Sequence, residues 1–153
     1  MINMALNENA LAEYRILAMR PLSKIDPEKD LEWICKSFGF LGPRDRKKTA
    51  FRIFKALIEA ARENKGLTSD ELAAKLSLTR GTMVHHLNKM IRSGLVIYHE
   101  GTYKLRGRSL KSTIEEAHRD IDRIFENLYK VAESIDQAYG LFSRSWKNIN
   151  VRT

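Results

Sequence analysis

A long apolar ladder near the C-terminus limits most strongly how this chain can fold. Its members recur at alternating spacings of four and three residues: Leu110, Ile114, Ala117, Ile121, Ile124, Leu128, Val131, Ile135, Ala138 and Phe142. This heptad pattern is typical of a helix whose apolar side packs against another helix. We therefore expect residues 109–153 to form one long helix and a tail. The ladder from Leu110 to Ile135 is predicted to be the interface between two copies of the chain.

The ladder has a second apolar edge. Phe125, Ala132 and Tyr139 each follow an inner ladder position by one residue. A simple two-stranded coiled coil usually carries charged residues at such flanking positions. We therefore expect the long helix to contact further helices as well, and those of residues 8–38 are the candidates.

The stretch before the ladder predicts a compact set of local elements. Thr68 or Ser69 can cap a short helix, and a turn at residues 77–79 leads to a second helix over residues 80–92, which Gly94 ends. Two β-prone runs follow, and Glu100-Gly101 between them suits a two-residue hairpin turn. Helix, turn, helix and hairpin in this order indicate a winged helix-turn-helix, a mainly α fold with a small β-hairpin. The domain is expected to span residues 43–108.

The predicted helix over residues 80–92 has two unlike sides. Met83, Leu87, Met90 and Ile91 form an apolar side, and the opposite side contains no acidic residue. We expect this opposite side to enter the DNA major groove. The predicted base contacts are Arg80, Val84, His85 and Asn88. The predicted phosphate contacts in and after this helix are Thr79, Thr82, Lys89, Lys104 and Arg106.

The net charge of +8 is concentrated in two segments. Residues 43–67 and residues 79–108 each have a net charge of +5, whereas residues 109–153 are neutral. A basic surface confined to particular elements is typical of a protein that binds a polyanion such as nucleic acid.

The segment before the short helix contributes one of these basic blocks. Residues 44–65 read as one helix with a core side of Phe51, Phe54, Leu57, Ile58 and Ala61. Its first turn would carry four cations, namely Arg44, Arg46, Lys47 and Lys48. Cations at a helix N-terminus oppose the helix dipole, and a bound phosphate would offset that cost. We predict phosphate contacts for these four residues, with a solvated basic turn as the alternative.

Residues 1–42 predict two helices and little more. One would cover residues 8–19, and the other would begin at Asp26-Pro27 and present Leu31, Ile34, Cys35 and Phe38 on one side. We expect this N-terminal extension to pack on the core or to support the dimer. No residue pattern specifically indicates an effector pocket, so an effector remains open.

Other classes of protein find no support in the sequence. Cys35 has no partner for an internal disulfide, so a reducing cytoplasm is the natural location. No apolar run is long enough to span a membrane. Phosphate loops, nucleophile elbows and metal-ligand spacings are missing, so neither catalysis nor a cofactor is expected. His85 and His86 are adjacent on a helix and cannot both bind a metal from one side.

Residues 78–96 resemble the recognition segment of winged-helix transcription regulators of the ArsR and MarR type, which occur in archaea and bacteria. Thr82-Met83 occupies the threonine–valine position of that pattern, His86-Leu87 the histidine–leucine position, and Gly94-Leu95-Val96 the glycine–leucine–valine position. The resemblance covers about residues 45–108. It implies a homodimer that binds a partly palindromic operator in double-stranded DNA.

The resemblance also bears on metal sensing and on an alternative function. Metal-sensing members use a cysteine pair in the helix before the recognition helix, or histidine and acid ligands in the last helix. Here residues 70–76 contain no cysteine and the last helix contains only His118 as a histidine, so no metal site is expected. The alternative function is a protein- or RNA-interaction subunit of the transcription machinery. Such domains often lose the basic helix surface that this chain keeps.

Overall fold

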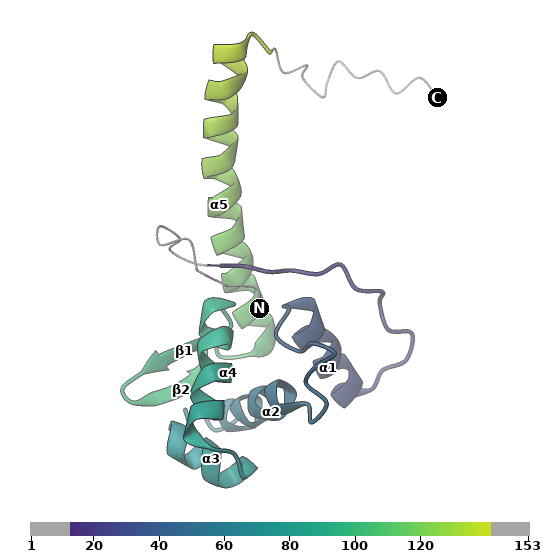
Figure 1. Cartoon of the computed structure of the whole chain (residues 1–153), viewed down its shortest axis with the longest axis vertical. Coiled ribbons are helices and arrows are strands. Elements are labelled where there is room, and N and C mark those ends of the chain that lie inside the picture. Colours follow the sequence, from purple (N-terminus) through teal and green to yellow (C-terminus); the bar gives the residue numbers. More distant parts are fainter. Residues whose placement is uncertain (1–12, 142–153) are drawn as a thin grey trace. The chain divides into compact units, whose positions relative to one another are not determined.

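The computed structural model describes residues 13–141, which divide into two compact units, one up to Ala117 and one from His118 onward. Helix α5 begins in the first unit and continues into the second. The elements in order are α1 (Pro27–Ser37), α2 (Thr49–Ala61), α3 (Ser69–Leu76), α4 (Arg80–Arg92), β1 (Val96–His99), β2 (Thr102–Leu105) and α5 (Leu110–Tyr139) (Figure 1). The predicted mainly α winged helix-turn-helix is confirmed.

The core of the first unit joins α2, α3, α4 and the hairpin. Phe54 and Leu57 of α2 are fully buried together with Leu72 of α3 and Leu87 of α4. A hydrogen bond also joins α2 to α3: the Arg52 guanidinium donates to the carbonyl of Leu76 at the end of α3, at 2.8 Å. These contacts fix α3 and α4 on α2 as one rigid support.

The hairpin forms with the predicted two-residue turn. Val96 pairs with Leu105 and His99 pairs with Thr102, which leaves Glu100 and Gly101 as the turn. Both turn residues have positive φ, 50° and 78°, as a turn matching the twist of the strands requires. Leu67 adds a bridge that the sequence did not indicate, exchanging two backbone hydrogen bonds with Tyr103. This bridge ties the hairpin to the segment before α3.

Helix α2 is shorter than predicted, since it begins at Thr49 and ends at Ala61. The Asp45 carboxylate accepts hydrogen bonds from the N–H groups of Thr49 and Ala50 at 2.9 and 3.0 Å. Lys48 adopts a left-handed conformation just before the helix. The four cations therefore precede the helix, and the predicted cationic first turn is wrong because Asp45 caps the helix from outside it.

Helix α1 begins as predicted, with the Asp26 carboxylate accepting from the N–H groups of Glu28 and Lys29. The predicted helix over residues 8–19 is wrong for residues 13–19, which are not helical (Figure 1). Tertiary hydrogen bonds hold this segment instead. Leu17 N–H donates to the carbonyl of Ser37 at 2.8 Å, and Trp33 Nε1 donates to the carbonyl of Arg20 at 2.9 Å. Residues 8–12 lie outside the described part of the chain.

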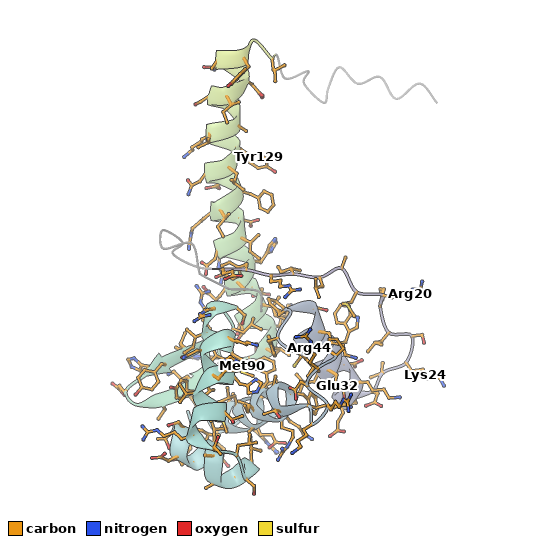
Figure 2. All side chains as sticks on the ribbon, viewed as in Figure 1. Arg20, Lys24, Glu32, Arg44, Met90 and Tyr129 are labelled. Atoms are coloured by element: carbon orange, nitrogen blue, oxygen red, sulfur yellow. The ribbon has the colours of Figure 1, made fainter. Side chains whose placement is uncertain are left out.

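Helix α5 has two differently buried parts. Leu110 and Ile114 pack against the core, and Ala117 is only 1% exposed. Packing within their own chain therefore covers Ala117 almost completely and Leu110 and Ile114 in part, and a dimer contact by these three side chains stays a prediction. From Ile124 onward the large apolar side chains are 40% exposed or more, and Tyr129 projects from the ribbon (Figure 2). Phe142 of the ladder lies outside the described residues, and no described helix is both long and apolar enough to cross a membrane.

Candidate nucleic-acid interface

The exposed side of α4 is the centre of the candidate interface. Met83, Leu87 and Met90 anchor the opposite side, each at 0% exposure. At the N-terminus the Thr79 hydroxyl accepts from the N–H of Thr82 at 3.2 Å and donates to the Thr82 hydroxyl at 2.8 Å. Both threonines are exposed but bonded to each other, so their first role is to cap the helix.

The predicted base-contacting residues lie on one accessible helix side. Arg80, His85 and Asn88 are exposed, whereas Val84 is half-buried. A Cβ atom at Gly81 would meet nothing within 4 Å, so packing inside the chain does not require a glycine there. Helix α4 contains no acidic residue. The structure therefore presents a helix surface of cations and hydrogen-bonding groups with room for close approach.

The cations before α2 do not all remain available. Lys48 Nζ lies 2.7 Å from a carboxylate oxygen of Glu32 in α1. Arg44, Arg46 and Lys47 are exposed and make no ion pair within residues 13–141. The four predicted phosphate contacts therefore differ: Lys48 is paired with the carboxylate of Glu32, whereas the other three have no carboxylate partner within residues 13–141.

His86 of α4 lies near the carboxylate of Asp45, which precedes α2. The His86 side chain is half-buried, and its Nδ1 atom is buried without a hydrogen-bond partner in the described part of the chain. Burial lowers the pKa of His86 below 6.5, although the nearby Asp45 carboxylate partly opposes that shift. Burial alone would raise the pKa of Asp45, but the N–H groups of Ala50 and Thr49 lower it overall. His86 is therefore neutral near pH 7, and Asp45 is ionised.

The hairpin supplies a smaller set of groups. Lys104 and Arg106 are both half-buried, and the Arg106 guanidinium lies 3.9 Å from a carboxylate oxygen of Glu116 in α5. Tyr98 is 58% exposed and packs against Tyr103 with ring centroids 4.8 Å apart. Arg106 is thus partly neutralised within the chain, while Lys104 has no carboxylate partner among residues 13–141.

Two contributors were not predicted from the sequence. Tyr98 adds an exposed aromatic ring to the hairpin, which alternation in β1 does not predict, because Tyr98 lies on the same side of the strand as the buried Val96. Arg52 positions α3 through the carbonyl of Leu76, and no sequence signal distinguishes it, because α2 also contains Lys55 and Glu59. Within the described residues, no group of three or more histidine, cysteine, aspartate or glutamate side chains could hold a metal ion.

Comparison with known proteins agrees with this geometry. A family profile described as a helix-turn-helix domain matches residues 47–99, which run from just before α2 to the end of β1. No curated protein and no solved structure shows a significant match to the chain. The segment that carries α2, α3 and α4 is therefore a helix-turn-helix domain, a type of domain that suggests DNA binding.

Proposed function

We propose that this protein is a homodimeric regulator of transcription that binds specific sequences in double-stranded DNA. Helix α4 enters the major groove, and the β1–β2 hairpin lies on the phosphate backbone. The exposed side of α4 is the observation that carries this proposal, because it joins Arg80, His85 and Asn88 on a rigid helix without any acidic residue. Such side chains form hydrogen bonds with base edges in the major groove.

Each residue of the interface has a distinct role in this proposal. Arg80 reads guanine and Asn88 reads adenine by paired hydrogen bonds, and Val84 contacts a thymine methyl group. Lys89 and Lys104 hold phosphates together with Arg44, Arg46 and Lys47, which make no ion pair within residues 13–141. Lys48 and Arg106 contribute less, because Glu32 and Glu116 already lie beside them.

The second unit supports the homodimer. Ile124, Leu128, Val131 and Ile135 are each 40–59% exposed in the single chain. A contiguous apolar surface of this kind usually marks a protein–protein interface. Residues 109–153 thus provide dimerisation, residues 43–108 bind DNA, and residues 1–42 support the folded unit. The recognition segment favours a regulator of the ArsR and MarR type, acting in the cytoplasm.

Selection of bound duplexes from a random pool tests sequence specificity. The full chain is expected to enrich a two-fold symmetric sequence whose half-sites are separated by about 10 base pairs or a multiple of this. A parallel selection from random RNA examines the alternative function. Enrichment of RNA alone, or no enrichment from either pool, would contradict the proposal.

A further inference from the structure

The two edges of the α5 apolar surface differ in chemistry. Between Ile121 and Ala138, the inner positions are Ile121, Ile124, Leu128, Val131, Ile135 and Ala138. One edge is apolar and consists of Phe125, Ala132 and Tyr139, all exposed in the single chain. The other edge is polar and consists of Asp120, Asn127 and Ser134. A partner helix must accommodate both edges.

Helix direction decides which edges meet. A two-fold axis parallel to the helices places the apolar edge of one helix against the polar edge of the other. Phe125 would then face the partner's Asp120, a carboxylate that already accepts a hydrogen bond of 3.0 Å from Arg123. A two-fold axis perpendicular to the helices places like edges together, so that apolar groups face apolar groups. This arrangement avoids desolvating a carboxylate beside an aromatic ring.

We infer that α5 pairs with the α5 of a second copy in antiparallel direction, with Leu128 opposite the partner's Val131. The inference rests on the proposed homodimer and specifies its geometry. In this register Ile124 faces the partner's Ile135, and Ile121 faces the partner's Ala138. Every inner position from Ile121 to Ala138 then has an apolar counterpart.

Side-chain size supports the same register. Large residues face small ones at two levels, with Phe125 opposite the partner's Ala132 and Ile121 opposite the partner's Ala138, and such alternation fills a core evenly. If the register were shifted by one heptad toward the start of α5, Ala117 would have to contact the partner helix, but this side chain is only 1% exposed. A shift in the other direction leaves Ile121 without an apolar counterpart in the described chain.

The charged side chains near the seam do not reverse the preference for antiparallel pairing. Asp122 lies beyond the apolar edge, and antiparallel pairing brings this flank of both helices to one side, whereas Glu126 lies on the side of the helix away from the seam. The two Asp122 side chains are exposed, so solvent and salt screen their repulsion. Burial of the Phe125 rings, 48% exposed in the single chain, is the larger effect.

Disulfide trapping of the full chain distinguishes the two directions. The variants Ile124→Cys and Ile135→Cys are prepared separately, allowed to exchange subunits and oxidised, and covalent dimers are measured on non-reducing gels. The natural Cys35 does not interfere, because it is fully buried and burial raises its pKa to about 12. Arg123→Cys, an exposed position off the seam, serves as the matched control.

Antiparallel pairing predicts a covalent dimer only in the mixture of the two variants, and none in either variant alone. A covalent dimer in each variant alone would show parallel pairing and overturn the inference. The pair Leu128→Cys and Val131→Cys repeats the test one layer inward, in case the first substitutions disturb folding. Light scattering of the unmodified chain distinguishes failure of the antiparallel pairing from failure of the homodimer. If the chain is a dimer but no mixture of cysteine variants gives a covalent dimer, this interface is rejected. If the chain is a monomer, the homodimer itself is rejected. DNA binding is measured independently of both.

Discussion

At the residue scale, the interface contains side chains that read bases and side chains that hold phosphates. His85 is exposed in the middle of α4, while Lys104 lies on the hairpin. A base contact changes the preference among sequences, whereas a phosphate contact changes affinity for all sequences alike. These two residues therefore separate the two kinds of contact experimentally.

His85→Ala is expected to reduce discrimination between the selected duplex and altered half-sites by about 1–3 kcal/mol. Lys104→Ala is expected to weaken binding to every duplex and to reduce the salt dependence by about one phosphate contact. Fluorescence anisotropy with matched and altered duplexes measures both effects. Equal losses on all duplexes for His85→Ala would remove that residue from base reading.

Alanine substitutions at two glycines test whether the surface of α4 must stay free for close approach to DNA. At Gly81 a Cβ meets nothing in the chain, so Gly81→Ala should raise the free energy of unfolding by up to about 1 kcal/mol. The same variant should bind DNA about tenfold more weakly, equivalent to ~1.4 kcal/mol, because the methyl group prevents close approach.

Gly94 is the matched control for that substitution. It has a φ of 78°, and a Cβ there would lie 2.6 Å from an atom of the Tyr14 ring. Gly94→Ala should therefore lower the free energy of unfolding by about 1–3 kcal/mol. Urea denaturation measures both variants, and unchanged DNA affinity in Gly81→Ala would contradict close approach at α4.

His86 predicts a pH dependence of stability. Because burial lowers its pKa in the folded state, the unfolded chain takes up this proton first as the pH falls. The stability contributed by neutral His86 is therefore complete above a pH of about 6.5 and declines below it. Urea denaturation between neutral and mildly acidic pH should show a smaller decline in His86→Gln. An equal decline in that variant would exclude His86 as the cause.

At the element scale, local signals predict some boundaries and tertiary contacts decide the others. Thr68 and Thr79 cap α3 and α4, and both helices agree with the sequence because each cap acts on its own helix. The start of α2 could not be predicted in this way, since Asp45 caps it across the left-handed Lys48. The exposed side of α4 was predictable for the same local reasons, except that the partial burial of Val84 depends on packing.

Sequence patterns failed for segments that are held by distant partners. Leu17 bonds to Ser37, and this tertiary hydrogen bond competes with the helix that the apolar spacing of residues 8–19 indicated. Leu67 likewise pairs with Tyr103, far along the chain. Ion pairs such as Lys48 with Glu32 also join distant positions. The sequence therefore does not predict which cations have a carboxylate partner among the described residues.

The cap at α2 gives a prediction for this element. Asp45→Ala removes two hydrogen bonds to the start of α2 and should lower the free energy of unfolding by about 0.5–2 kcal/mol. Asp45→Asn keeps an acceptor oxygen and serves as the control, with a smaller loss expected. Thermal and urea denaturation measure both variants, and equal stability of Asp45→Ala and the unmodified chain would reject the capping role.

At the scale of the whole molecule, the proposed regulator consists of two copies of the chain. Ile121→Glu combined with Leu128→Glu places charges on the α5 seam and should produce monomers in light scattering, because each charge would need desolvation on pairing. The matched control is Arg123→Glu on an exposed position of the same helix, which should remain dimeric. A dimer that persists in the double variant would locate the interface elsewhere.

The proposed function depends on binding of duplex DNA through a basic, base-reading surface. A salt titration of the full chain with its selected duplex and with a scrambled duplex measures this binding. We expect tighter binding to the selected duplex at every salt concentration and a steep loss of affinity for both duplexes between about 50 and about 200 mM salt. Absence of binding at about 50 mM salt, or affinity that does not change with salt, would contradict the proposed function.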